Sequence, residues 1–234
     1  SSLFSRDGNT EMLWKPTLSI NYNYKKNKVN FFTNAVYNYR EGRGVLDITS
    51  RYYEAGKQLD SINRVNTAFR FRNNNYTAKV GMDYTPNKKN SFGIVLNGFL
   101  FAGRPTPTTH TTFSTIDGDV FSRLNSHTTN KLSWKNFSTN LNYKHTFDST
   151  GTELTIDLDY SGYKNVSDQL LRTGFFDGNN NQTSDSMFLK GHLPSEINIY
   201  SLKSDFTKTF KTGLRIEAGI KTSYVKSDNL VDYV

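Results

Sequence analysis

The sequence predicts an all-β chain that folds as an antiparallel, up-and-down transmembrane β-barrel. Apolar and polar residues alternate with a period of two in segments of about ten residues, which is typical of strands with one apolar face. The connections between these segments alternate between short and long, and aromatic residues gather near the segment ends. A tilted membrane strand needs about 9–11 residues, so the segment length also fits.

The alternation is clearest in residues 153–160, where one face receives Leu154, Ile156, Leu158 and Tyr160. Residues 15–24, 76–84 and 214–224 repeat the pattern. No segment sustains the i, i+3, i+4 spacing of an amphipathic helix, so we expect few helices. The most apolar run, residues 92–101, contains Asn97 and Gly98 and is too short to be a membrane-spanning helix.

These patterns predict about eight strands. They cover residues 14–24, 29–53, 63–85, 90–101, 133–147, 152–163, 197–210 and 213–226. The second strand alternates less regularly, because Phe32 and Val36 interrupt its polar face. We expect the outer halves of the second and third strands to stand clear of the main sheet.

The predicted connections are sorted by length. Those at residues 25–28, 86–89, 148–151 and 211–212 are short. Those at residues 54–62, 102–132 and 164–196 are long and polar. Short turns at one end and long loops at the other are typical of outer-membrane barrels.

Aromatic residues form two groups along the predicted strands. Near the short turns lie Tyr24, Tyr84, Phe92, Tyr143, Phe147 and Phe210; toward the long loops lie Trp134, Tyr160, Tyr163, Tyr200 and Tyr224. Aromatic rings prefer the two membrane interfaces, so the groups favour a barrel. A soluble β-sandwich also alternates apolar and polar residues and remains the alternative. It gives no reason for connections sorted by length.

The expected topology makes residues 1–234 a single segment of a larger barrel. With the short turns in the periplasm, the first predicted strand runs inward and the eighth runs outward, which puts both ends outside. Complete single-chain bacterial barrels have an even number of strands and short periplasmic turns. Because complete barrels ordinarily keep both ends in the periplasm, we expect an internal segment, with the plug and the barrel termini elsewhere. Its unpaired edge strands, 14–24 and 213–226, predict that it does not fold alone or that it aggregates.

Two hairpins resemble a known family. Residues 80–91, which include Gly81, Asp83, Tyr84 and Asn87, resemble the G-x-D-Y-x-x-N-x-K-N hairpin of the Bacteroidota outer-membrane β-barrel family. That family forms the barrel part of TonB-dependent receptor-like proteins. Residues 214–229 resemble a later hairpin of the same family. The resemblance implies a bacterial outer-membrane location, a barrel of about 22 strands, and contacts with TonB and a surface lipoprotein through parts outside this sequence.

Composition excludes several other classes. The chain of 234 residues is 35% hydrophobic and carries a formal net charge of +8, with a mean hydropathy of −0.64. It has no Cys, which excludes a disulfide scaffold, a cysteine zinc site and a cysteine nucleophile. The basic runs at residues 25–28 and 88–89 fall in predicted tight turns, so we expect no nucleic-acid partner.

No motif predicts catalysis or a cofactor. Phosphate-binding, dinucleotide-binding and G-x-S-x-G patterns are absent from the sequence, so we expect no enzyme activity and no cofactor. The four histidines, His110, His127, His145 and His192, lack metal-ligand spacing. Residues 177–188 recapitulate a calcium loop only partly, because Gln182 and Phe188 occupy its glycine and glutamate positions. We therefore expect no metal site.

The remaining candidates are polar strand residues and loop residues. The expected lumen-facing set is Lys79, Asp83, Asp157, Asp159, Lys203, Asp205, Arg215, Glu217 and Lys221. The expected ligand-loop set is Arg104, His110, Phe113, Phe121, Phe175 and Phe176. Cross-strand ion pairs that hold the wall would also explain the first set.

The sequence therefore predicts an integral outer-membrane barrel of a TonB-dependent receptor-like protein, surrounded by outer-membrane lipid. Its expected role is uptake of a small solute or binding at the cell surface. Two alternatives stay open: a secretion-associated barrel without transport, and a soluble adhesin or carbohydrate-binding module built as a β-sandwich.

Overall fold

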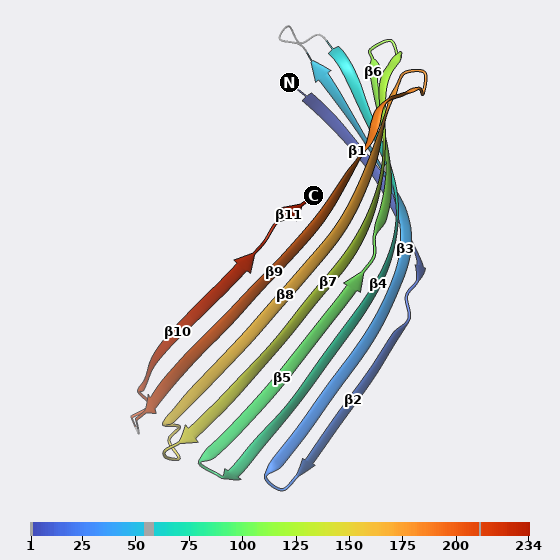
Figure 1. Cartoon of the computed structure of the whole chain (residues 1–234). Coiled ribbons are helices and arrows are strands. Elements are labelled where there is room, and N and C mark those ends of the chain that lie inside the picture. Colours follow the sequence, from blue (N-terminus) through green and yellow to red (C-terminus); the bar gives the residue numbers. More distant parts are fainter. Residues whose placement is uncertain (1, 54–58, 211) are drawn as a thin grey trace.

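The described chain forms one antiparallel β-sheet of eleven strands (Figure 1). The computed structural model describes residues 2–53, 59–210 and 212–234. The strands are β1 (Ser2–Trp14), β2 (Thr17–Lys26), β3 (Val29–Tyr53), β4 (Leu59–Asn87), β5 (Asn90–Gly103), β6 (Thr106–Thr115), β7 (Val120–Thr146), β8 (Glu153–Asp177), β9 (Gln182–Thr209), β10 (Arg215–Asn229) and β11 (Asp232–Tyr233). In these residues no helix is long and apolar enough to cross a membrane.

The eleven strands occupy eight positions across the sheet. Strands β1 and β2 both pair with β3, one after the other along its length. Strands β5 and β6 together fill the place between β4 and β7, and β10 and β11 both pair with β9. The predicted all-β, antiparallel fold with about eight strand positions is confirmed.

Prolines explain two of the three breaks within a position. Pro16 separates β1 from β2, and Pro105 separates β5 from β6. Proline has no backbone N–H to donate to a neighbouring strand, so it interrupts a ladder. Its carbonyl still accepts: Tyr39 N donates to Pro16 O at 3.1 Å, and Asn130 N donates to Pro105 O at 3.2 Å. The broken strands therefore stay in line.

Short turns close one end of the sheet, as the sequence predicts, and we call this the inner end and the opposite one the outer end. Asn27 adopts the left-handed conformation, with φ of 50°, between β2 and β3. Between β4 and β5, the side chain of Asn87 accepts from the backbone N–H groups of Lys89 and Asn90, both at 2.9 Å. Such side-chain-to-backbone bonds are typical of asparagine in tight turns. Of the predicted turn 211–212, residue 211 lies outside the described residues.

The long loops predicted at residues 102–132 and 164–196 are wrong. Most of these residues belong to β6, β7, β8 and β9, and the connections there are short, at residues 104–105, 116–119 and 178–181 (Figure 1). Of the predicted connection 54–62, residues 54–58 lie outside the described residues and 59–62 belong to β4. The outer halves of β3 and β4 also do not stand clear, because they pair with each other and with β1 and β6.

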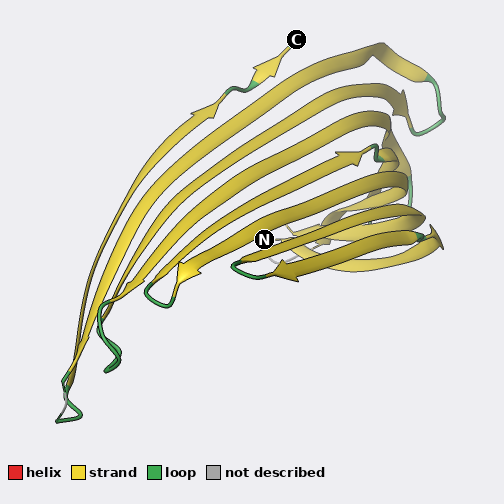
Figure 2. Ribbon diagram, turned by 90° about the horizontal axis from the view of Figure 1, so that it is seen from below, coloured by secondary structure: helices red, strands yellow, loops and turns green. Residues whose placement is uncertain are grey.

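The sheet is a single curved layer (Figure 2). None of the described apolar residues is buried, so this part of the chain has no hydrophobic core. A β-sandwich packs two sheets face to face about 10 Å apart, and the sandwich alternative is therefore wrong for the described residues. Within them, β10 and the β1–β2 position form the two lateral edges of the sheet.

Candidate functional site

The two faces of the sheet differ in chemistry, and the strand register defines them. Side chains of paired residues point to the same face. The pairing connects Ile20 to Ala35, Ala78, Gly98 and Phe137 in turn, and we call this side face A. The alternate residues of each strand form face B.

Face A carries an apolar band across the inner half of the sheet. Its members include Leu18, Ile20, Tyr22 and Tyr24 of β2, Ala78, Val80 and Met82 of β4, and Leu154, Ile156 and Leu158 of β8. Many are strongly exposed, with Leu18 at 62% and Ile220 at 72%. A continuous apolar surface of this kind marks a contact with membrane or protein and is avoided in water.

Two rows of aromatic rings border the band on face A. The inner row includes Tyr84, Phe92 and Tyr143, with successive ring centroids 6.4 and 4.9 Å apart. The outer row includes Tyr37 and Tyr76 at 4.9 Å, then Phe137, Tyr160, Tyr200 and Tyr224 at 6.4, 5.1 and 6.3 Å. Eight residues from Tyr84 to Tyr76, on a strand tilted by about 40°, correspond to about 20 Å along the membrane normal. This is close to the height of the apolar band of outer-membrane barrels.

Two of the predicted girdle residues lie on the other face. Trp134 pairs with Phe101, and Tyr163 pairs with Asn136 and Ile197, all on face B. The rings of Trp134 and Phe101 are 4.7 Å apart. Trp134 and Tyr163 lie about as far from the short turns as the outer row does, but their side chains are on face B and not on face A.

Face B is polar between the two rows, and it carries all nine predicted lumen-facing residues. On this face Asp157 accepts from the side-chain amide of Asn142, and Asp159 from that of Asn140, both at 2.7 Å. Asp83 accepts from the amide of Asn30 at 3.2 Å. These bonds run between neighbouring strands, so amide–carboxylate pairs brace the wall.

Four members of this set form ion pairs along single strands. Lys203 lies 2.5 Å from Asp205 on β9, and Arg215 contacts Glu217 on β10. The Lys79 ammonium lies 5.7 Å from the centre of the Phe32 ring. Cross-strand ion pairs, the structural explanation offered by the sequence, are replaced by amide–carboxylate bonds at Asp83, Asp157 and Asp159.

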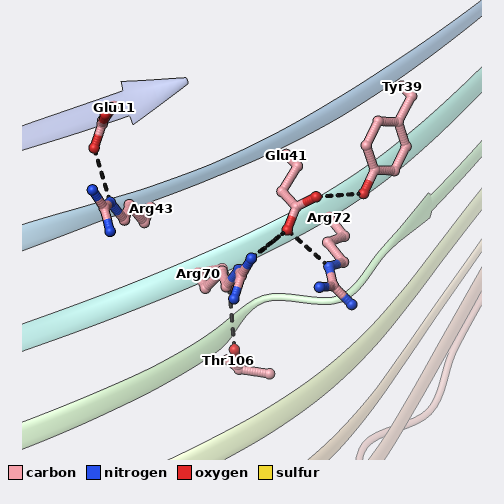
Figure 3. A network of polar contacts seen from close by, with 7 residues as sticks. All are labelled: Glu11, Tyr39, Glu41, Arg43, Arg70, Arg72 and Thr106. Carbon is pink, nitrogen blue, oxygen red and sulfur yellow. Dashed lines mark hydrogen bonds and ion pairs between the residues drawn. The ribbon is translucent and has the colours of Figure 1, made fainter. Parts of the chain in front are cut away.

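Beyond the outer aromatic row, face A becomes charged (Figure 3). Glu41 follows Tyr37 by four residues on the same face and is the centre of a network. Its Oε1 accepts from Arg70 Nη2 at 2.8 Å and from Arg72 Nε at 3.0 Å, and its Oε2 accepts from the Tyr39 hydroxyl at 2.9 Å. The hydrogen bond from Arg72, followed by that from Tyr39, lowers the pKa of Glu41. Glu41 is therefore a carboxylate at neutral pH.

Face B becomes more apolar at the same level. The ring of Phe71 covers Gly42, and the ring of Phe69 covers Gly44 on the neighbouring strand. A Cβ at Gly42 would lie 2.5 Å from Phe71 and 2.8 Å from the backbone oxygen of Glu11. Glycine at this position thus permits the aromatic ring to pack onto the strand.

The six predicted ligand-loop residues do not converge on one site. His110 and Phe113 belong to β6, Phe121 to β7, Phe175 and Phe176 to β8, and Arg104 to the break between β5 and β6. His110 and Phe176 lie on face A, whereas Phe113 and Phe175 lie on face B. Their assignment to loops is wrong for all of them except Arg104, and a role in ligand binding stays a prediction.

The calcium-like segment is a turn closed by its own side chains. Asp177 accepts from the backbone N–H groups of Asn179 and Asn181, both at 2.8 Å, and from the Asn181 amide at 3.0 Å. The amide bond from Asn181 lowers the pKa of Asp177. Across the part of the chain that the structure describes, no group of three His, Cys, Asp or Glu residues could hold a metal ion.

The arrangement defines a class of protein. A single antiparallel sheet with an apolar band between two aromatic rows, and a polar opposite face, is the wall of a transmembrane β-barrel.

The comparisons with known proteins find a family match for part of the chain. Residues 145–234 match the model of the outer membrane protein beta-barrel family. This segment contains the turn before β8 and all of β8 to β11. Over these residues the match supports the predicted outer-membrane β-barrel family, and it indicates a location in the bacterial outer membrane. No curated protein matches the chain.

Proposed function

We propose that this barrel wall lines the passage of a TonB-dependent receptor-like transporter that takes up or binds a small solute at the cell surface. The main support for this proposal is the polar character of face B between the aromatic rows. Lipid would require apolar side chains on this face as well, whereas Lys79, Asp157, Asp159 and their amide partners are polar and suit the interior of a barrel. In a barrel, the face opposite the lipid borders the lumen.

The open sheet supports a large barrel. Eight strands that closed on themselves would leave a lumen just wide enough for side chains. Here β10 and the β1–β2 position do not pair with each other in the described residues. Further strands between these edges would widen the lumen until it holds a plug and a solute, as in outer-membrane transporters of about 22 strands.

Energy coupling rests on the resemblance of residues 80–91 and 214–229 to TonB-dependent receptor-like barrels. A coupled receptor changes its lumen when the inner membrane is energised, and this change can be measured without knowing the solute. The sequence contains no Cys, so single cysteines can be introduced here without removing native ones.

The test uses the whole protein in intact cells with Asp159→Cys on face B and Leu158→Cys on face A as its matched neighbour. A hydrophilic maleimide should label Asp159→Cys several-fold faster than Leu158→Cys. Labelling of Asp159→Cys should slow when a protonophore is added or when TonB is deleted. Equal labelling with and without TonB would contradict coupling and favour a barrel without energised transport.

A further inference from the structure

We propose that face A carries a binding site for the phosphate of an outer-leaflet lipid headgroup, formed by Arg70 and Arg72 around Glu41 with Arg43 beside Arg70. We call these four residues the arginine cluster (Figure 3). The inference rests on the outer-membrane location and on the two faces of the sheet. It does not depend on the proposed transport function.

The position of the cluster matches the level of lipid headgroups. Glu41 and Arg72 each lie four residues beyond the outer aromatic row, at Tyr37 and Tyr76. Four residues on a tilted strand rise about 10 Å along the membrane normal. The headgroup layer begins where the hydrocarbon core ends, at the level of the aromatic rings. The cluster is on the same face as the apolar band, so it faces lipid and not the lumen.

Glu41 holds the guanidinium groups of Arg70 and Arg72 in place, and some of their N–H donors stay free. Arg72 donates only Nε to Glu41, and Arg70 donates Nε and Nη2 to the same oxygen. Within the described residues, both Nη atoms of Arg72 lack a hydrogen-bond acceptor. The two side chains are 56% and 58% exposed, whereas the Glu41 side chain is only 12% exposed. The carboxylate therefore lies beneath the two cations that it holds, and the free donors face outward.

The charge and the shape of the surface both suit a phosphate-bearing lipid. Arg43 is paired with Glu11 at 2.8 Å, so the five charged groups of Figure 3 sum to one positive charge. Arg43 and Arg70 border an open hollow of about 430 Å³ whose lining includes Val45, Ala68 and Thr108. Arginine binds phosphate oxygens with two parallel N–H groups, which a single lysine cannot do. The hollow lies on the side of Arg43 and Arg70 that is away from the apolar band, so it would receive the sugar part of the headgroup and not the acyl chains.

The experiment measures lipid binding by the whole protein purified in a zwitterionic detergent. Lipid A, a phosphorylated glycolipid, is added, and native mass spectrometry counts the bound molecules. The arms are Arg70→Gln, Arg72→Gln and the matched control Arg40→Gln, which removes the same charge from face B one residue from Glu41. Each cluster variant should weaken binding by about tenfold, as expected for loss of a charge-assisted bond. Arg40→Gln should bind as the unmodified protein does.

Two further probes separate the possible ligands. Dephosphorylated lipid A should bind at least about tenfold more weakly than lipid A, and inorganic phosphate at millimolar concentration should not displace the lipid. Equal binding of the dephosphorylated lipid, displacement by inorganic phosphate, or an equal loss in Arg40→Gln would each overturn the proposal. Heat-dependent mobility on a gel verifies that every variant is folded, and Arg72→Lys gives a second variant that keeps the charge but loses the paired donors.

Discussion

Tyr37 and Glu41 lie on the same face of β3, four residues apart, and between them that face changes from aromatic to charged. The same change occurs on β4 between Tyr76 and Arg72. No bulge separates the two members of either pair, because the register of β3 and β4 is continuous from Val29 to Tyr52. The strands thus leave the hydrocarbon without turning over, and they continue as paired strands above it.

Between the aromatic rows, a charge on face A should destabilise the barrel far more than the same charge on face B. Val80 lies midway between Tyr76 and Tyr84 on face A, and Val95 lies near the same level on face B. Val80→Arg should lower the free energy of unfolding by about 2–4 kcal/mol, because arginine would enter hydrocarbon. Val95→Arg, with the same change of side chain, should cost clearly less. Denaturant unfolding in lipid vesicles provides both values, and equal losses would contradict the assignment of the faces.

The glycine under the Phe71 ring should not tolerate a methyl group. Gly42→Ala would place its Cβ 2.8 Å from the Glu11 backbone oxygen and within 2.5 Å of the Phe71 ring. We expect a loss of about 1–3 kcal/mol in unfolding free energy, as for other overpacked sites. Gly98→Ala is the control, since no atom lies within 4 Å of its added Cβ. A Gly42→Ala protein as stable as Gly98→Ala would show that β1 and Phe71 do not enclose this position.

Asp148 should make the stability of the β7–β8 turn depend on pH. Its carboxylate accepts from the hydroxyl and backbone N–H of Thr150 and from the backbone N–H of Thr152. These bonds, with the Thr150 hydroxyl first, hold the pKa of Asp148 well below its ordinary value. A depressed pKa gives stability that is present above the ordinary pKa and is lost as the pH falls toward the folded value.

The comparison of the unmodified protein with Asp148→Asn isolates this contribution. Thermal unfolding between about pH 7 and about pH 2 should give the unmodified protein the higher Tm near neutrality, and the difference should shrink below about pH 4. Other titrating groups affect both proteins alike. A difference that stays constant over the whole range would mean that the charge of Asp148 does not contribute.

The inner half of the sheet could be predicted from the sequence because two signals agree there. The apolar stripe keeps one phase, as in Leu154 to Tyr160, and turn-forming residues such as Asn27 and Asn87 limit each strand. Pro16 and Pro105 are a further sequence signal, because they mark where β1 ends before β2 and where β5 ends before β6.

The outer strands over residues 106–132 and 164–196 were missed because the polarity of the faces changes along the strand, so the apolar stripe leaves its own phase and these segments look like polar loops. The outer halves of β3 and β4 were predicted as strands, although there too apolar residues such as Phe69 and Phe71 occupy face B. The arginine cluster was missed for the same reason. Extending the phase of Tyr76 and Val80 backward along β4 reaches Arg72 and Arg70, and this was the signal that could have found them.

The most direct test of the account is the accessibility of spin labels placed one at a time at residues 70–84 of β4, in the whole protein reconstituted in lipid bilayers. Collisions with oxygen report hydrocarbon, and collisions with a water-soluble nickel chelate report water. If face A is in contact with lipid, even-numbered positions from Tyr76 to Tyr84 should favour oxygen, odd-numbered positions there should favour nickel, and Arg72 and Arg70 should favour nickel. Oxygen preference at the odd-numbered positions, or no alternation between Tyr76 and Tyr84, would contradict the claim that face A is the lipid-facing side of an outer-membrane wall.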